Sequence, residues 1–239
     1  MPFHHVDGPT QQRFYQRCIN ESLALLKQRK SELTATPLTP AAAARFKLWF
    51  GYDSTSSFTP STTYTAEFQN SPYTPPHVAT FVAARTHIVG VMDKLIGALE
   101  ESIRVSQVVR GFRGGNYSSL FAYVYGDDTT HRHIHLAGSF VGATPTSMPI
   151  LNNSSNLDWD NDVNTIVHET SHFDDMGGLL DIMIKEIAPP NVEYGPYGSG
   201  PCQAVAANYP SVALMNSDSL SFYIVDGMHG TADSFNYLV

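Results

Sequence analysis

The stretch VNTIVHETSHFDDMGGLLD, residues 163–181, decides how this chain is interpreted. It contains the pentapeptide HETSH (168–172), an HExxH pattern in which His168 and His172 stand four positions apart. On a helix, residues i and i+4 lie on one face about a turn apart, so both imidazoles can reach one ion. Glu169 is rotated off this pair but stays close, where a carboxylate can take a proton from a metal-bound water. The pattern predicts a catalytic zinc site on a helix.

The flanking residues favour a helix that places both histidines near its end. Acidic and amide side chains at 160–162 can cap it, and Val163, Ile166 and Val167 give it an apolar side. The glycine pair at 177–178 is predicted to end the helix and to let the chain fold back. The two ligands therefore precede a return segment.

A catalytic zinc takes three protein ligands and leaves one position open for water. Asp181 follows His172 by nine residues, just beyond the glycine turn, and is the nearest acid that a returning chain can aim at the ion. Asp174 and Asp175 are closer in sequence but are expected to continue the helix as solvated acids. Glu193 stands near the thermolysin-like spacing of roughly twenty residues and stays open as the alternative third ligand.

Spacing also separates the classes of zinc peptidase. The metzincin pattern requires Gly three and His six residues after the second histidine, but Asp175 and Gly178 occupy those positions. HETSHFDDMGGLLD instead resembles the aspzincins, the deuterolysin and peptidyl-Lys metalloendopeptidase family, in which HExxH precedes a glycine-rich turn and an Asp ligand. Further segments resemble that family in the same order: RFKLWFG (45–51), FAYVYG (121–126), IHLAGSF (134–140) and ALMNSD (213–218).

The resemblance implies a fold and an activity. The expected fold is α+β and mostly helical, with a small sheet beside the HExxH helix. The implied activity is that of a zinc endopeptidase with one Zn2+, held by His168, His172 and Asp181. The catalytic tyrosine of the family falls on Tyr197, whose phenol would donate a hydrogen bond to the oxyanion of the tetrahedral intermediate. Residues 182–196 are additional to the family pattern and are expected at the rim of the cleft.

The resemblance also implies how protein or peptide substrates are bound. Residues 134–139 fall where an edge strand of the family binds extended substrate through its backbone. The substrate-binding residues expected in this strand are His135, Ala137 and Gly138. Asp218 falls where Lys-specific members place an acid in the pocket for the residue that follows the scissile bond. Ser221 replaces a second acid of that pocket, so a preference for lysine is expected to be weaker or altered.

The chain of 239 residues, 42% of them hydrophobic, is expected to form a single domain. Residues 1–103 are predicted to be helical, with helices over 10–30, 41–50 and 77–103. Residues 104–239 are predicted to hold the HExxH helix and a sheet, with strands at 105–109, 120–125 and 131–139. The Ser, Thr and Pro-rich stretch 52–76 is expected to be an exposed excursion without a core element.

Composition narrows the range of partners. The net charge is −8, and from Ile134 onward one base, Lys185, faces twelve acids. Such a surface attracts cationic peptide and repels nucleic acid, although solubility alone explains the excess equally well. No stretch approaches a membrane span, and the first ten residues lack the pattern of a signal peptide. The protein is therefore expected to act inside a cell, to leave by a signal-independent route, or to be a trimmed mature form. Cys18 and Cys202 are expected to be two reduced, partly buried thiols, with a single Cys18–Cys202 bridge as the alternative, and the protein is expected to be a monomer.

Two interpretations of the site compete with this one. A gluzincin-like peptidase would use Glu193 in place of Asp181. A zinc-binding toxin or interaction module would keep the metal and lack general proteolytic turnover. His131, His133 and His135 alternate along a predicted strand, and we interpret them as polar surface residues and not as a second metal site.

Overall fold

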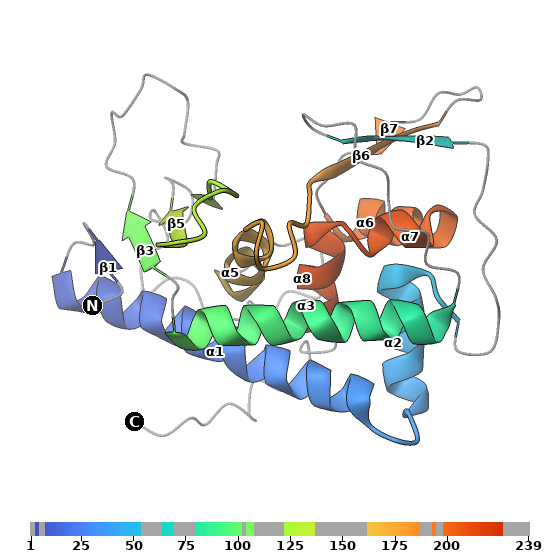
Figure 1. The fold of residues 1–239 in the computed structure, drawn as a ribbon, viewed down its shortest axis with the longest axis horizontal. Coiled ribbons are helices and arrows are strands. Elements are labelled where there is room, and N and C mark those ends of the chain that lie inside the picture. Colours follow the sequence, from blue (N-terminus) through green and yellow to red (C-terminus); the bar gives the residue numbers. More distant parts are fainter. Residues whose placement is uncertain are drawn as a thin grey trace.

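The computed structural model describes residues 3–4, 8–53, 64–68, 80–101, 104–107, 122–136, 162–186, 193–194 and 198–226. Over these residues the chain is mostly helical and has two small sheets (Figure 1). None of the helices within these ranges combines the length and the apolarity that crossing a bilayer requires. The expected mostly helical fold with a small sheet is confirmed at this level, and the second sheet was not predicted.

The N-terminal part supplies three helices, close to the predicted ranges: α1 (Gly8–Thr34), α2 (Pro40–Phe50) and α3 (Phe81–Glu101). Thr39 caps α2 by accepting a hydrogen bond from the backbone N–H of Ala42 at 3.2 Å. Gly51 ends it with a φ of 74°, a left-handed conformation that favours glycine. Helices α1 and α3 lie side by side along the length of the molecule and form one wall of the core (Figure 1).

The first sheet contains β1 (Phe3–His4), β3 (Arg104–Gln107), β5 (His133–Leu136) and β4 (Ala122–Tyr123), in the order β1-β3-β5-β4. Strands β1, β3 and β5 are parallel, whereas β4 runs antiparallel to β5. His135 pairs with Ser106 on one side and with Tyr123 on the other. The prediction that this strand is an edge is therefore wrong for His135 and Leu136, because β4 pairs with both. Within the described sheet, β4 is the strand at that edge.

The second sheet contains β2 (Tyr64–Phe68), β6 (Ile182–Glu186) and β7 (Glu193–Tyr194), all antiparallel, in the order β2-β6-β7. It joins β2, from the stretch 52–76 that was expected to be an exposed excursion without a core element, to β6 and β7, from the residues 182–196 that the family pattern does not contain. The sequences of β2 and β6 each give only a weak strand signal. The residues that pair between these two strands lie more than a hundred positions apart in the chain. Sequence periodicity does not report such long-range pairing.

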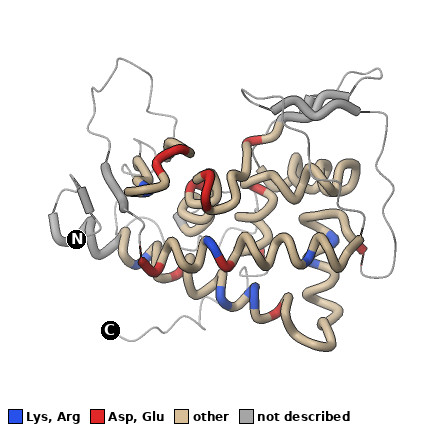
Figure 2. The backbone as a smooth tube through the Cα atoms, viewed as in Figure 1, with Lys and Arg blue, Asp and Glu red and all other residues tan. Residues whose placement is uncertain are grey.

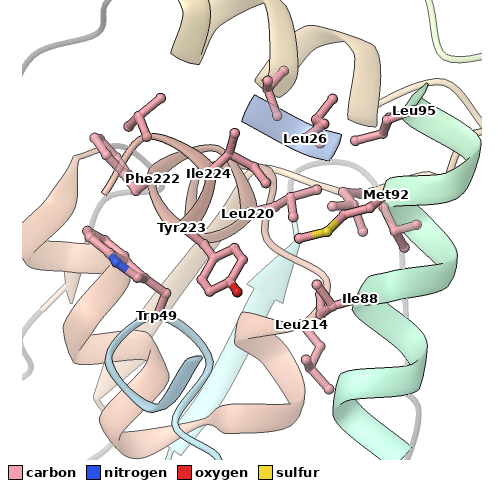
Figure 3. Packing of buried hydrophobic residues seen from close by; sticks show 14 of the residues in the cluster. Leu26, Trp49, Ile88, Met92, Leu95, Leu214, Leu220, Phe222, Tyr223 and Ile224 are labelled. Carbon is pink, nitrogen blue, oxygen red and sulfur yellow. The ribbon is translucent and has the colours of Figure 1, made fainter. Parts of the chain in front are cut away.

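The C-terminal part supplies α5 (Asp162–Ser171), α6 (Ser199–Asn208), α7 (Pro210–Ala213) and α8 (Ser217–Val225). Every residue of α8 is buried, because α8 packs against α1, α2, α5 and α6. Figure 3 shows this centre, in which the Trp49 ring stacks on Phe222 with centroids 5.4 Å apart. Burial of each large apolar side chain contributes about 1.5–3 kcal/mol. Cys18 and Cys202 form no disulfide, as expected, and both are fully buried instead of partly buried.

A buried arginine anchors the C-terminal end of α8. Arg29 of α1 is 3% exposed and donates hydrogen bonds to the carbonyl oxygens of Ile224, at 3.0 Å, and of Asp226. Glu32 accepts from the same guanidinium at 2.9 Å, and the Trp49 indole N–H donates to the Asp226 carboxylate at 2.9 Å. A cation at the carboxyl end of a helix is favourable, and here it also satisfies the last carbonyl groups. Helix α8 is thereby held at its carboxyl end, the end opposite Ser217 and Asp218.

Candidate metal centre

Helix α5 carries the HExxH pattern and ends earlier than predicted. Its apolar residues are fully buried, as the pattern requires, and α5 packs against α1 and α8. The helix stops at Ser171, and residues 172–177 form turns instead of continuing to the glycine pair. Phe173 is fully buried at this point, and its carbonyl oxygen accepts from the N–H of Met176 at 2.9 Å and of Gly178 at 3.0 Å. Burial of this ring draws the chain inward, so Asp174 and Asp175 lie outside the helix.

The return segment after the glycines is held by its backbone. Gly178 has a φ of 56°, the left-handed conformation that lets the chain reverse here. Three backbone hydrogen bonds then fix residues 179–180: Leu179 N to Ser171 O at 2.9 Å, Leu180 N to Met215 O at 2.9 Å, and Ser217 N to Leu180 O at 3.1 Å. The segment is therefore attached both to the end of α5 and to the start of α8, directly before Asp181.

Three side chains from α5, the turn after it and this segment meet at one point. The Nε2 atoms of His168 and His172 are 3.0 Å apart. Oδ1 of Asp181 lies 3.3 Å from Nε2 of His168 and 3.5 Å from Nε2 of His172. Within the part of the chain that the structure describes, these are the only His, Cys, Asp or Glu side chains grouped closely enough to hold a metal ion.

The hydrogen bonds that Nδ1 makes in His168 and in His172 determine which ring nitrogen carries the proton. Nδ1 of His168 lies 2.6 Å from Oδ1 of Asp218, and Nδ1 of His172 lies 2.7 Å from the carbonyl oxygen of Leu179. Since ionised carboxylate and carbonyl oxygens only accept, each Nδ1 carries the proton and donates it. In neutral rings the two Nε2 atoms then turn lone pairs toward each other and toward the Asp181 carboxylate. Three acceptors in such contact repel one another unless a cation or a proton lies between them.

The three ligand atoms fit a zinc ion in size and in chemistry. A tetrahedral zinc bound at about 2.0–2.1 Å separates its ligands by about 3.3 Å, and the observed separations are 3.0, 3.3 and 3.5 Å. The circle through the three atoms has a radius of about 1.9 Å, so a point just off their plane lies at the zinc–ligand distance from each. Two imidazoles and one carboxylate also form a ligand set found in catalytic zinc sites. The residues present therefore fit one divalent zinc ion.

The protonation of the two histidines follows from their neighbours. Burial alone would lower the pKa of His168, but hydrogen bonds to Asp181 and Asp218 and the charges of Asp218 and Glu169 outweigh burial and raise this pKa well above its usual value. Burial lowers the pKa of His172, and the charge on His168 lowers it further. Without a metal, one shared proton therefore resides on His168, and it must leave when a metal binds.

Hydroxyl groups fill the space behind the ligands. The Ser217 hydroxyl lies 3.1 Å from Nδ1 of His172 and 3.0 Å from the Ser171 hydroxyl. The Ser171 hydroxyl also lies 2.7 Å from the carbonyl oxygen of His168. Both serines are fully buried. Polar atoms are expensive to bury unless they are hydrogen-bonded, so this polar layer belongs with the two histidines that it contacts.

The β4–β5 hairpin packs against the turn that follows α5. Arg132, in a left-handed conformation with a φ of 49°, pairs with Asp175, which sequence reasoning had interpreted as a solvated acid. Asp128 accepts hydrogen bonds from the backbone N–H groups of His131 and His133, both at 3.1 Å. Burial opposes ionisation of Asp128, but these bonds outweigh it and hold the pKa of this carboxyl at about 2. The hairpin is thus tied to the metal-bearing segment by Arg132 and by the backbone bond from Asp174 N to Gly126 O at 2.9 Å, while Asp128 stabilises the hairpin's own turn.

The other predicted site residues differ in how far the structure describes them. Glu169 lies on α5 next to His168 and is 7% exposed. The half-buried ring of His135 stacks on Tyr123 with centroids 4.8 Å apart. Tyr197, Ala137 and Gly138 lie outside the described residues, so their predicted roles stay predictions. For Glu193, the structure describes the backbone within β7, opposite Lys185 of β6.

The surroundings of Asp218 differ from the substrate pocket in which the resemblance placed this residue. It is 1% exposed, and its two carboxylate oxygens contact His168 and the backbone N–H of Gly198, the latter at 2.9 Å. A pocket for lysine needs an acid with an oxygen directed at the substrate, whereas both oxygens here have partners within the protein. Sequence reasoning missed the contact with His168, since nothing in the spacing of 50 residues between them indicates it.

The charged residues along the chain segment that carries the metal ligands are all acidic. Residues 163–182 contain four acids and no lysine or arginine. Figure 2 shows acidic positions along α5 and the turn after it, whereas lysine and arginine lie mostly on α1, α2 and α3. A negative environment stabilises a bound cation and attracts positively charged peptides to the site.

No family model matches the chain, and no curated protein matches it in sequence. The fold nevertheless has a counterpart among zinc peptidases. A solved structure of a zinc peptidase from Grifola frondosa is similar to it, with a TM-score of 0.57 over 91% of this chain and 95% of that chain. The two sequences are 20% identical over the match, so the likeness concerns the fold.

Proposed function

We propose that this chain is a zinc-dependent endopeptidase. One observation carries the proposal: the carboxylate of Asp181, beyond the glycine turn, meets the two Nε2 atoms of His168 and His172 at zinc-ligand spacing. These three side chains hold the ion, and the shared fold with a zinc peptidase supports this assignment. Three protein ligands leave a position for water, as in catalytic zinc sites.

Zinc, when bound, lowers the pKa of the attacking water and polarises the carbonyl of the scissile peptide bond. Glu169 accepts the proton of that water and delivers it to the leaving amine. Its place on α5, one residue after a ligand, keeps its carboxylate beside the centre. Tyr197 donates a hydrogen bond to the charge that develops on the carbonyl oxygen. The backbone of the neighbouring sheet binds the extended substrate, with β4 as its described edge strand.

Lysine selectivity is a separate part of the proposal. The resemblance attaches it to Asp218, but both oxygens of this buried carboxylate already have partners. We therefore propose that cationic peptides are favoured by the general negative charge of the site more than by this residue. Under this proposal, the preference for lysine directly after the scissile bond is weak. The fraction of new N-termini that begin with lysine measures it.

The test is digestion of a denatured protein mixture, with and without a chelator, followed by mass spectrometry of the new N-termini. Cleavage that the chelator abolishes and added zinc restores supports the proposal. Cleavage that the chelator leaves unchanged refutes it. A protein that binds zinc and yet leaves every substrate intact would favour the alternative of a zinc-binding interaction module. The matched variant Glu169→Gln controls for a contaminating protease, because it removes the proposed base and keeps all three ligands.

A further inference from the structure

Asp218 contacts two parts of the site at once. Its Oδ1 accepts a hydrogen bond from Nδ1 of His168 at 2.6 Å, and its Oδ2 accepts from the backbone N–H of Gly198 at 2.9 Å. The side chain is 1% exposed, so water does not compete for either oxygen. One carboxylate thus joins a proposed metal ligand to the start of α6.

Gly198 is a position at which the chain needs such support. It precedes α6 with a φ of 101° and a ψ of 157°, a conformation that residues other than glycine avoid. No side chain caps α6 at this residue, although its carbonyl oxygen accepts from Cys202 N at 3.1 Å. In the sequence Gly198 directly follows Tyr197, the proposed oxyanion donor. The turn at Gly198 is therefore the described position nearest in sequence to that tyrosine.

The anchor of Asp218 does not move easily. It lies in the first turn of α8, a helix buried along its whole length and held at its far end by Arg29. The residue before it, Ser217, donates its backbone N–H to Leu180 next to Asp181. A displacement of the His168 ring is therefore expected to reach Gly198 through the planar carboxylate, because α8 is closely packed along its whole length.

We propose that Asp218 is a positioning residue that couples metal binding at His168 to the position of the turn at Gly198. Binding of a cation at Nε2 makes the Nδ1 proton of the same ring a stronger donor, and this fixes the orientation of the carboxylate. The fixed carboxylate in turn holds the Gly198 N–H. Coupling of this kind is reciprocal, so an ordered turn also favours the metal. The consequence for Tyr197 rests on the proposed function, whereas the coupling itself does not.

Asp218→Asn tests the first half of this coupling. Asparagine has the same size but one accepting oxygen, so it cannot accept from both His168 and Gly198. If its amide NH2 faces Nδ1 of His168, the ring proton is forced onto Nε2, the atom that must bind the metal. We expect zinc affinity to fall about 10–100-fold and the visible spectrum of bound Co2+ to change. Tyr52→Phe is the control, because it removes a buried hydroxyl that pairs with Ser211 of α7, outside α5 and α8, and should leave both unchanged.

Hydrogen exchange at the Gly198 amide tests the second half and needs no variant. In the wild-type protein, zinc should slow this exchange several-fold relative to the chelated protein, and Asp218→Asn should remove the response. Exchange at Gly198 that ignores zinc in the wild-type protein overturns the proposal, as does an Asn variant with unchanged affinity and protection. Neither readout requires proteolysis. Zinc-dependent protection without peptidase activity would refute the proposed function alone, whereas zinc-dependent cleavage without protection would refute the coupling alone.

Discussion

Replacing Asp181 by alanine removes one of the three proposed ligands and tests the geometry on which the function rests. The substitution leaves the His168 and His172 rings 3.0 Å apart, with their outer nitrogens still bonded to Asp218 and Leu179. The centre then has two neutral donors and no anionic one. A two-ligand site loses both a bond to the ion and the negative charge that offsets its two positive charges.

The size of the loss follows from the affinity of complete zinc sites. Structural zinc sites with four protein ligands bind with about 10–16 kcal/mol, which corresponds to roughly 3 kcal/mol for each ligand. Since 1.4 kcal/mol is a factor of ten, Asp181→Ala should weaken zinc binding by about 10²–10³-fold. Competition with a chromophoric chelator at constant pH measures this directly. The rise in unfolding temperature that zinc confers should shrink in parallel, because ligand stabilisation scales with RT ln(1 + [L]/Kd).

Asp174→Ala is the matched control for this experiment. Asp174 is an exposed acid seven residues earlier, so its loss changes the net charge by the same amount without touching the cluster. Equal affinities of the Asp181 and Asp174 variants would refute the proposed ligand set. A large loss in Glu193→Ala, with Asp181→Ala unaffected, would instead establish the gluzincin-like alternative.

Three further predictions follow from individual residues. Glu169→Gln should reduce turnover about 10²–10⁴-fold in steady-state kinetics, while zinc affinity, measured by chelator competition, stays within a few-fold. A loss of zinc affinity as large as the loss of turnover would contradict the role of Glu169 as the base. Gly51→Ala should lower the free energy of unfolding by at least about 2 kcal/mol in urea, because Gly51 has a φ of 74° and a Cβ there would overlap the Ala206 carbonyl oxygen. As its control, Gly90→Ala adds a Cβ in open space on α3 and should leave the stability unchanged or raise it by up to about 1 kcal/mol. Asp128, with a folded pKa of about 2 against an ordinary value of about 3.9, stabilises the fold above pH 4, and this contribution is lost as the pH falls toward 2. The stability gap between wild type and Asp128→Asn should therefore narrow between pH 5 and 3, and a constant gap would contradict the assignment.

The local features of the site could be predicted from the sequence because they depend on neighbours along the chain. Helical periodicity places His168 and His172 on one face, and the reversal at Gly178 brings the following acid back. The helix end itself was misplaced. A buried aromatic side chain, Phe173, outweighed the glycine signal, and the helix stopped six residues before Gly177. Burial of a particular ring depends on the surrounding core, which periodicity does not report.

Contacts between distant segments could not be predicted. The sheet that joins β2 to β6 pairs Tyr64 with Glu186, and neither segment shows a strong alternating pattern. The contact between Asp218 and His168 is of the same kind, since the acid alone looks like an ordinary first-turn residue of a helix. The resemblance to a family assigned Asp218 to a pocket for lysine, whereas in the structure this carboxylate contacts His168.

The polarity of the start of α8 is best explained by the metal site. Residues 216–219 and 221 are polar and almost fully buried, in the centre of an otherwise apolar core. A buried polar group destabilises the fold unless it is hydrogen-bonded, and these groups bond to His168, to His172 and to one another. The ligands are therefore carried by α5 and the segment after it, but their orientation depends on a second helix. Apolar substitutions at Ser217 or Asp218 should consequently weaken metal binding before they weaken the fold, a ranking that zinc titration and urea unfolding of the same variants would establish or reverse.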